Sequence, residues 1–411
     1  MSELDHRNVT RRDVLQAGAG LAASGVLASS SSTSAAPLTN VPSPYEALGL
    51  KHVINATGTV TVLGGSVMPP EVVTAWAEAS KHFVDLLELQ DKVGQKIAQL
   101  LDVEAAMVTT GAAGALLLGT AAAATRGDRK LIARLPDTTG AKNEVLIQKT
   151  HHSCYDNQLT DVGIRLIEVE TVADVTKAIT GQTAVMFFMN VAESAGKINR
   201  EEWVALARQK KIPTLIDAAA DVPPINRIAE FFKLGFDLVA ISGGKAIRGP
   251  NDTGLLLGRK DLIEAAKRNA NPHCGTIGRM MKVSKEDMIA LLAAVERFVK
   301  LDPVAEAKEL DRRIAVIEKT LSDLPTIKFE RIVPPIANHV PHLQITWDEK
   351  HLKITREKVT HDLLDGDPRI RIGRVAGTGD KGILISVLTL QEGEERIVAT
   401  RLCEILKKEV N

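Results

Sequence analysis

The chain predicts an α/β protein whose large domain is built on a mostly parallel sheet, followed by a smaller α/β domain at the C-terminal end. Its 411 residues exceed one ordinary domain. Aromatic residues make up only 3% of the chain, while alanine, valine, leucine and isoleucine are abundant, which is typical of buried parallel strands. Apolar runs of strand length alternate with stretches of helical periodicity, which indicates βαβ units.

These segments follow one another in order. The predicted strands are 105–109, 144–148, 165–169, 184–189, 214–217 and 237–241, and the predicted helices are 71–83, 89–101, 115–125, 172–180 and 200–210. Right-handed crossovers between parallel strands place all their carboxyl ends at one edge of the sheet, where α/β proteins bind ligands. Polar residues fall at five of these ends: Thr109, Gln148, Asn190, Asp217 and Ser242. We therefore expect a ligand site at this edge.

The stretch ISGGKAIRGPNDTGLLL, residues 241–257, carries one lysine behind a serine and two glycines. Glycines permit a sharp turn and close approach of a flat ligand. A lysine on such a turn can present its amine into a cleft and form a Schiff base with an aldehyde cofactor. Lys245 is thus the candidate catalytic residue. A glycine-rich turn with a solvated lysine explains this stretch alone equally well.

Asp217 ends the predicted strand 214–217 and is followed by three alanines. A carboxylate at the end of a buried strand needs a partner, because burying it unpaired costs several kcal/mol. A protonated pyridine nitrogen would supply that partner and keep the ring electron-withdrawing. The alternative is a helix-capping or salt-bridged aspartate. Lys245 lies one helix-plus-strand unit later, so we expect the two side chains to share one crevice.

The segment Thr110–Gly111–Ala112–Ala113 joins a strand to a helix N-terminus. Free backbone N–H groups and the helix dipole at such a junction form a phosphate site. We expect these four residues to cradle a cofactor phosphate. A tightly packed βα turn is the competing interpretation, because small residues also ease contact between helix and sheet.

His151 and His152 follow the strand 144–148, with Tyr155 behind them. A flat ring at a strand end can stack on a pyridine face, so either histidine is a candidate for this contact. The alternatives are surface histidines, or a metal site that includes Cys154. No metal is predicted, because no further ligand has characteristic spacing.

The N-terminus contains Thr10–Arg11–Arg12, followed by an apolar run rich in glycine and alanine. This order resembles a twin-arginine export signal, over residues 1–36, and predicts a periplasmic or secreted protein. The run is too short to span a bilayer as a mature helix. A disordered tail rich in serine and alanine is the alternative.

Charge and cysteine content bear on the class of partner and on disulfide bonds. The formal charge is zero, which gives no indication of a nucleic-acid or anionic-membrane partner. Three widely spaced cysteines argue against a disulfide framework. Residues 37–70 are expected to form an arm, 71–300 the large domain and 301–411 the small domain. In the arm, the polar segment 55–66, ending at Ser66, lines either a substrate cleft or the surface.

Several of these stretches together resemble one family. INATGTVTVLGGSVMPP, VTTGAAGAL, LIDAAADVPP, ISGGKAIRGPNDTGLLLGRKDLI and IGRMMKVSKEDM run in order through residues 54–288. They are similar to fold-type I pyridoxal-phosphate enzymes of the aminotransferase-like superfamily, within the group of selenocysteine synthases and D-glucosaminate-6-phosphate ammonia lyases.

That resemblance implies pyridoxal 5′-phosphate as the cofactor. Lys245 would be the Schiff-base lysine, Asp217 the partner of the pyridinium, and Ser242 with residues 111–113 the phosphate ligands. In related enzymes a Gly-Thr turn of the neighbouring subunit also touches the phosphate, and Gly275–Thr276 is the candidate here. A homodimer or a ring of dimers is therefore expected.

Arginines are candidates for binding an anionic amino acid, because the guanidinium fork suits carboxylate and phosphate. Arg248 lies three residues after the lysine, and Arg279 follows Gly278. Strand 369–374 carries alternating arginines, of which Arg374 is the candidate. Each of these also fits a solvated surface residue. The last helix, 392–409, is predicted to serve packing.

The function expected from these residues is α,β-elimination of ammonia from an amino acid or amino-sugar acid. Lys245 would be the general base and Asp217 would hold the cofactor ring protonated. Transamination or racemisation would use the same residues. A selenium or sulfur transferase would need affinity for tRNA, which the neutral charge and the export signal disfavour. A cofactor-binding protein without catalysis is the alternative of another class.

Overall fold

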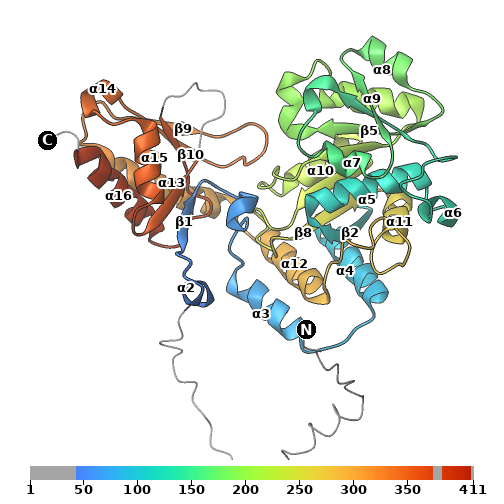
Figure 1. Cartoon of the computed structure of the whole chain (residues 1–411), viewed down its shortest axis with the longest axis horizontal. Helices are drawn as coiled ribbons and strands as arrows, with labels where there is room; N and C mark the ends of the chain where they lie inside the picture. The colour runs from blue at the N-terminus through green and yellow to red at the C-terminus, as the bar shows by residue number, and fades with distance from the viewer. Residues whose placement is uncertain (1–42, 374–381, 409–411) are drawn as a thin grey trace, which may run out of the picture. The chain divides into compact units, whose positions relative to one another are not determined.

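The computed structural model describes residues 43–373 and 382–408 (Figure 1). The predicted export signal and Arg374 lie outside these ranges. Two units are distinguished, residues 1–51 and 52–411. In the first, the helix α2 (Pro44–Ala47) is capped by Ser43, with Glu46 closing a capping box. The second unit contains the three sheets of the described residues.

A seven-stranded sheet forms the centre of the large domain. Its spatial order is β2 (Ala105–Thr110), β8 (Thr253–Gly258), β7 (Leu238–Ser242), β6 (Thr214–Asp217), β5 (Thr183–Met189), β3 (Glu144–Gln148) and β4 (Arg165–Val169). The five strands from β7 to β4 are parallel, whereas β8 runs antiparallel to both of its neighbours. The prediction of a mostly parallel sheet is confirmed, and β8 is a strand that the sequence analysis did not separate from the lysine turn.

Alternate residues of the strands supply two hydrophobic clusters, one on each face of the sheet. Phe188 and Ile216 belong to one cluster, and their neighbours Phe187 and Leu215 belong to the other. The helices that cover the sheet are α3 (Pro70–Ala79), α4 (Leu86–Leu101), α5 (Gly111–Thr125), α6 (Arg129–Ile132), α7 (Asp156–Thr160), α8 (Val172–Ala178), α9 (Arg200–Lys210), α10 (Asn226–Leu234), α11 (Lys260–Asn269) and α12 (Lys285–Phe298).

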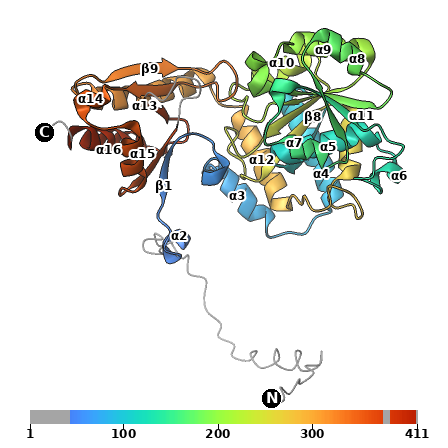
Figure 2. The ribbon, with the colours of Figure 1, turned by 45° about the horizontal axis from the view of Figure 1, so that its top comes forward.

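The helix α5 is the innermost of these, and Figure 2 shows it beside the sheet. Every residue from Gly114 to Thr125 is buried, which explains why the helix is apolar on all sides. At Gly119 a Cβ would come within 3.4 Å of both Leu215 and Leu238, so a small residue allows close contact between helix and sheet. This contact holds the middle of α5 against β6 and β7.

The C-terminal part has its own core. Strands β12 (Ile383–Ser386), β10 (His342–Thr346) and β9 (Lys328–Ile332) form an antiparallel sheet, and β1 (Val53–Ala56) pairs in parallel with β11 (Arg369–Ile372). The accompanying helices are α13 (Pro303–Leu321), α14 (Glu349–Leu352), α15 (Arg356–Leu364) and α16 (Glu394–Lys408). Ile54 and Ala56 are buried in this core. The expected arm thus contributes a strand to the C-terminal fold.

Several predicted boundaries agree with the structure. The strands 144–148, 165–169 and 214–217 and the helix 200–210 coincide with β3, β4, β6 and α9. By contrast, α3 ends at Ala79, four residues before the predicted end, and α16 begins at Glu394 rather than 392. Short 3₁₀ helices occupy Thr61–Leu63, Lys149–His151 and Asn190–Ala195. In residues 43–373 and 382–408 no helix is long and apolar enough to cross a membrane.

Candidate active site

Lys245 lies on a tight connection between β7 and β8. The Gly243 N–H donates to the Thr253 carbonyl at 2.8 Å, and the Gly249 N–H donates to the Gly243 carbonyl at 2.9 Å. At Gly244 a Cβ would lie 2.4 Å from the Asn251 Cα, so only glycine fits there. The turn therefore holds Lys245 at the carboxyl end of β7, where its half-buried side chain lines a cavity.

Asp217 reaches the same cavity from the neighbouring strand. β6 and β7 are adjacent and parallel, and Asp217 is in register with Ala240, five positions before the lysine. Its carboxylate is only 7% exposed and accepts a hydrogen bond from the Ala219 N–H at 3.0 Å. Burial raises the pKa of Asp217, and the Ala219 N–H and Lys245 oppose that rise. A cationic group inside the cavity would remove this cost.

The N-terminus of α5 forms a third wall. Gly111 has φ = 64°, and a Cβ on it would meet no atom within 4 Å. Thr110, the preceding residue, makes no side-chain capping bond, so the first N–H groups of the helix are left for a ligand. Gly111, Ala112 and Ala113 line the cavity together with Ser242. Thr110 itself does not line it. Its hydroxyl is buried without a hydrogen-bond partner among the described residues.

The cavity has a volume of about 530 Å³. Its lining combines residues of the large domain with residues of the segment 59–65 and of the loop between β9 and β10. The lining residues are Thr59, Thr61, Gly65, Gly111, Ala112, Ala113, Leu116, Tyr155, Met189, Val191, Asp217, Ala219, Ala220, Asp221, Ser242, Lys245, Asn251, Ala337 and Asn338. The expected contribution of segment 55–66 to a cleft is thus seen at Thr59, Thr61 and Gly65.

The cavity residues fit pyridoxal 5′-phosphate. Burial lowers the pKa of Lys245, and Asp217 and Asp221 oppose that change, so the amine is more easily present in the uncharged form that reacts with an aldehyde. The uncapped α5 N-terminus and Ser242 suit the phosphate, and the buried Asp217 suits the ring nitrogen. Lys245 has no side-chain hydrogen bond or ion pair among the described residues that would have to be broken first.

The expectation for the histidines needs correction. His151 is fully buried beneath the sheet edge: its Nδ1 accepts from the Met189 N–H at 3.2 Å and its ring packs edge-on against Phe188 at 4.5 Å. His152 instead contacts Asp156 at 2.5 Å and Glu168 at 3.3 Å. Neither lines the cavity, because residues 149–151 form a 3₁₀ turn that directs them elsewhere. Tyr155 is the aromatic residue at the cavity.

Burial also explains the state of His151. It lowers the pKa of the imidazole to about 4, so the ring is neutral at neutral pH. The His151 Nε2 lies 3.2 Å from the Gln148 amide nitrogen, and Nδ1 lies 3.2 Å from the Met189 N–H. Gln148 also binds the Ile198 backbone. The Thr109 hydroxyl donates to the Gly111 carbonyl. Gln148 and Thr109, two of the polar residues at strand ends, therefore stabilise the fold through backbone contacts.

Ser66 and Arg248 lie together at a narrow extension of the site. Both line a small cavity that Lys245 also lines, with Thr389 and Gln391 on the other side. The Ser66 hydroxyl donates to the Gly244 carbonyl at 2.9 Å, and the Arg248 Nε donates to the Val67 carbonyl at 2.9 Å. Arg248 has φ = 63°, a conformation that non-glycine residues rarely adopt.

Two other predicted residues, Arg279 and Thr276, are not brought to this cavity. Arg279 is exposed and donates to the Asn271 side chain at 3.3 Å. The Thr276 hydroxyl donates to the His273 carbonyl at 3.0 Å, and within one chain it does not line the cavity. Arg374 lies outside the described residues.

The sequence analysis missed three polar residues of the lining: Asp221, Asn251 and Asn338. The sequence could have indicated Asp221, because this second carboxylate follows Asp217 by four residues, after three alanines. Asn251 belongs to the lysine turn itself. Asn338 comes from the C-terminal part, and only the tertiary structure brings it here.

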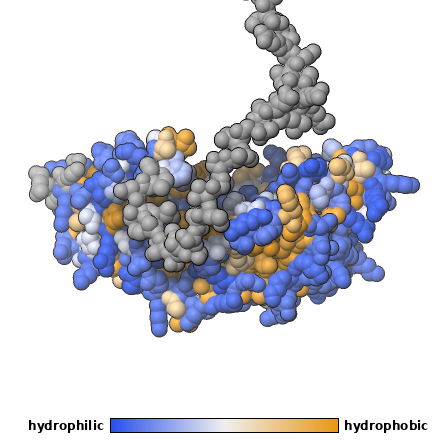
Figure 3. Space-filling model, turned by 90° about the horizontal axis from the view of Figure 1, so that it is seen from below, coloured by the Kyte–Doolittle hydropathy of each residue, from blue (hydrophilic) through white to orange (hydrophobic). Residues whose placement is uncertain are grey.

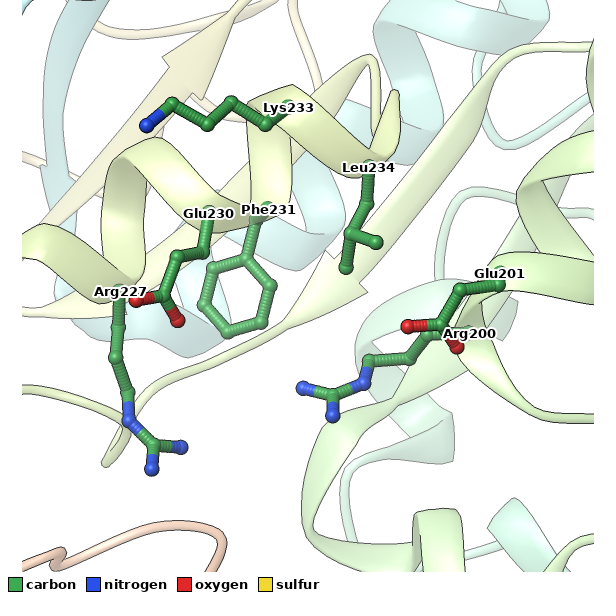
Figure 4. A pocket seen from close by; sticks show the side chains of 7 residues that line it. All are labelled: Arg200, Glu201, Arg227, Glu230, Phe231, Lys233 and Leu234. Carbon is green, nitrogen blue, oxygen red and sulfur yellow. The ribbon is translucent and has the colours of Figure 1, made fainter.

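A second cavity of about 360 Å³ lies at α9 and α10 (Figure 4). It is lined by Arg200, Glu201, Arg227, Glu230, Phe231, Lys233 and Leu234. Arg200 is already paired with Glu193 at 2.7 Å. In the part of the chain that the structure describes, no cluster of three histidines, cysteines or carboxylates could hold a metal ion.

Comparison with known proteins agrees with this geometry. The aminotransferase class-V family model matches residues 120–291. A D-glucosaminate-6-phosphate ammonia lyase of Salmonella typhimurium is 30% identical over 390 residues, covering 89% of this chain and 98% of that protein. An L-seryl-tRNA(Sec) selenium transferase of Caldanaerobacter subterraneus is 26% identical and covers 87% of this chain and 83% of that protein.

Solved structures give the same result. A structure of D-glucosaminate-6-phosphate ammonia lyase matches with a TM-score of 0.79 and 27% identity, over 90% of this chain and 100% of that one. A serine palmitoyltransferase of Sphingomonas wittichii matches with a TM-score of 0.54 and 12% identity, over 87% of this chain and 88% of that one, and shows the fold alone. The chain belongs to the fold-type I, pyridoxal-phosphate-dependent enzymes of the aminotransferase class-V family, close to D-glucosaminate-6-phosphate ammonia lyase and to selenocysteine-synthase-like proteins.

Proposed function

We propose that this enzyme is an ammonia lyase, which removes ammonia by α,β-elimination from an amino-sugar acid or a β-hydroxy amino acid. The observation that carries the proposal is the convergence of Lys245, Asp217 and the α5 N-terminus on one cavity. The similarity to a D-glucosaminate-6-phosphate ammonia lyase over nearly its full length supports the reaction class.

When bound, pyridoxal phosphate supplies an electron sink for the carbanion formed at the substrate's α-carbon. Gly111, Ala112, Ala113 and Ser242 would hold its phosphate, and Asp217 would keep a proton on its ring nitrogen. Burial raises the pKa of Asp217 in the cofactor-free protein, and a cationic partner in the cavity would lower it again.

Lys245 would anchor the cofactor and, once free, take the proton from the α-carbon. Burial lowers its pKa, which places the amine nearer the value that suits a general base at neutral pH. The β-hydroxyl then leaves as water. The remaining enamine takes up one water and gives ammonia and a 2-keto acid, so the atoms balance without a further reactant.

Arg248 and Ser66 would position the substrate's carboxylate. The Arg248 Nε is held by the Val67 carbonyl, which leaves the two terminal nitrogens of the fork to bind a carboxylate beside Lys245. The Ser66 hydroxyl bridges to the lysine turn at Gly244 and keeps this wall in place. Arg279 and Arg374 remain further candidates for anion binding.

Product analysis tests the proposal. Purified protein with cofactor is offered D-glucosaminate, its 6-phosphate and β-hydroxy amino acids of both configurations. Equimolar ammonia and 2-keto acid are the expected products. A keto acid without ammonia would indicate transamination, inversion at the α-carbon would indicate a racemase, and either result would contradict elimination.

A transferase is the second candidate, and the similarity to selenium transferases favours it. Such an enzyme would need to bind seryl-tRNA, for which the zero formal charge offers little electrostatic support. Titration with tRNA at physiological salt separates the two. Micromolar or tighter binding would favour the transferase.

We further propose that the enzyme works as a homodimer or a ring of dimers. Hydrophobic side chains are exposed on α3, α4 and the segment between them, among them Val73, Trp76, Phe83, Val84 and Leu87. Figure 3 shows hydrophobic residues gathered on the face seen from below Figure 1. Exposed apolar patches of this kind are typical of subunit interfaces. A neighbouring subunit could then bring Gly275–Thr276 to the phosphate.

Export by the twin-arginine route is also part of the proposal. Arg11 and Arg12 and the apolar run behind them support it. Replacing both arginines with lysine should keep the protein in the cytoplasm, whereas the unchanged chain should be found in the periplasm or the medium. Equal distribution of the two would overturn the proposal.

A further inference from the structure

Asp221 is a second buried carboxylate at the cavity, and the chemistry above does not use it. The residue is only 2% exposed and lines the cavity with Asp217 and Lys245. One of its oxygens, Oδ1, accepts a hydrogen bond from the Ala337 N–H at 3.0 Å. Among the described residues it has no second hydrogen-bond partner, so the carboxylate keeps unused acceptor capacity.

The loop between β9 and β10 completes this wall. The Asn338 N–H donates to the Ala220 carbonyl at 2.7 Å, and Arg227 donates through Nη2 to the Pro335 carbonyl at 2.8 Å. Ala337 and Asn338 both have positive φ, 53° and 44°, which turns the loop tip toward the large domain. Both residues line the cavity. The loop is thus held at three points, of which only one involves Asp221.

The chemistry of this wall selects its ligand. A carboxylate that has one oxygen held by a backbone N–H accepts hydrogen bonds from hydroxyl groups, and an asparagine amide both donates and accepts. Hydrogen bonds to a charged acceptor are stronger than those between neutral groups. A phosphate placed here would instead meet a like charge in a buried setting, which is strongly unfavourable.

We propose that Asp221 and Asn338 form a subsite for the hydroxylated chain of the substrate, and that Asp221 selects against a phosphorylated chain. This inference rests on the proposed function, because it assigns the side chain of the amino acid on which that function acts. It makes an unphosphorylated polyhydroxy amino acid the preferred substrate. Asp221 is then a specificity-determining residue.

Calorimetry on the cofactor-loaded enzyme tests this without any reaction. The probes are D-gluconate and 6-phospho-D-gluconate, polyhydroxy acids that carry no amine and therefore cannot be deaminated. We expect the enzyme to bind D-gluconate at least about tenfold more tightly, the loss of affinity that one charged hydrogen bond of about 1.5 kcal/mol or more represents. Asp221→Asn should reduce that preference about tenfold, and Asn338→Ala should weaken D-gluconate binding about three- to tenfold.

Three controls separate recognition from a structural role. Asp221→Asn keeps an oxygen for the Ala337 N–H, so hydrogen exchange at residues 337 and 338 should be unchanged. Val333→Ala, at an exposed residue of the same loop that does not line the cavity, should bind like the unchanged enzyme. Asp161→Asn, at an exposed aspartate of the large domain, controls for the loss of one charge.

The possible results decide the matter. Tighter binding of the phosphate, equal binding of both probes, no binding of D-gluconate, or an unchanged preference in Asp221→Asn would each overturn the inference. None of these results depends on ammonia release. Failure of the lyase assay would therefore leave this measurement interpretable, and failure here would leave the reaction class standing.

Discussion

At the residue scale, the site depends on two groups held in conditions that oppose their charged forms. Burial raises the pKa of Asp217 and lowers that of Lys245, while each favours the charge of the other. A bound cofactor ring would give Asp217 a further cationic partner inside the cavity. The cofactor would therefore offset part of the cost of burying this carboxylate.

Asp217→Asn should separate these two effects. Without cofactor, the variant should unfold at a higher temperature at neutral pH, because a charged buried carboxylate is removed. Because the pKa of Asp217 is raised in the folded state, the folded state holds this proton more tightly than the unfolded state does. The contribution of Asp217 to the free energy of unfolding therefore falls as the pH rises above about 3.8, the ordinary pKa of an aspartate. Cofactor affinity should drop at least tenfold, the size of a lost charged hydrogen bond.

Thermal unfolding of the cofactor-free and loaded forms measures both effects. Asp161→Asn is the matched control, since it removes a carboxylate at an exposed position outside the cavity. An Asp217→Asn enzyme that binds the cofactor as well as the unchanged enzyme would contradict the role given to Asp217.

His151 predicts a pH dependence that has nothing to do with catalysis. Its pKa is about 4 in the folded chain and 6.5 when exposed, so only the unfolded state takes up a proton between these values. Stability should be complete above pH 6.5 and fall toward pH 4, by at most about 3 kcal/mol at 1.36 kcal/mol per unit. Denaturant unfolding at several pH values measures this.

In His151→Asn this pH dependence should become shallower, because asparagine does not titrate and its side-chain oxygen replaces Nδ1 as acceptor from Met189. The exposed His82 is the control, and His82→Asn should leave the profile unchanged. Identical slopes for His151→Asn and the unchanged protein would refute this account of acid sensitivity.

At the element scale, the start of α5 is positioned by backbone contact with β8. A Cβ on Gly254 would lie 2.2 Å from the Gly111 carbonyl carbon, within the backbone of the proposed phosphate loop. No flexible side chain can move aside there. The close approach of β8 to this loop thus depends on a glycine in the strand, as is common where two backbones meet.

Gly254→Ala should therefore displace the loop, lowering cofactor affinity by more than tenfold and stability by roughly 1–3 kcal/mol. Equilibrium titration of the cofactor-free protein, followed by cofactor absorbance, measures the affinity. Gly181→Ala is the control, because its Cβ would meet no atom within 4 Å and its φ is not positive. Normal affinity in Gly254→Ala would show that the loop adapts.

Elements of strong periodicity were predictable from the sequence, and tertiary placement was not. The predicted bounds of β3, β4 and β6 match the structure. A short apolar run between two helical stretches indicates a buried strand in an α/β chain. β8 was missed because only three consecutive apolar residues, Leu255 to Leu257, mark it between two glycines. His151 was misplaced because spacing does not show that a 3₁₀ turn buries the ring under Phe188. Asn338 reaches the cavity from a loop that no local pattern identifies.

At the scale of the whole chain, the cavity is assembled from segments far apart in sequence. The segment 59–65 precedes the large domain, and Ala337–Asn338 follows it. β1 ties the first of these segments to the C-terminal core through its pairing with β11, and the Thr389 hydroxyl donates to the Asn55 carbonyl at 2.7 Å. The cavity is therefore lined in part by segments that lie outside the large domain.

The proposed dimer makes a prediction at this scale. Phe83 is fully exposed and Leu87 is 46% exposed, so glutamate at both positions should leave the folded chain intact. Charges in an apolar interface should weaken self-association at least tenfold. Sedimentation at several concentrations measures this, with Val172→Glu, at a residue of α8 that is 43% exposed, as the control. Unchanged association in the double variant would place the interface elsewhere.

The most direct test of the account is to locate the cofactor. Reduction of the purified protein with borohydride, digestion and mass spectrometry should find the phosphopyridoxyl group on the peptide that contains Lys245. Lys245→Ala should carry none, while Lys142→Ala, which replaces a lysine outside the cavity, should be labelled normally. A label on another lysine, or undiminished labelling of Lys245→Ala, would contradict the site described here.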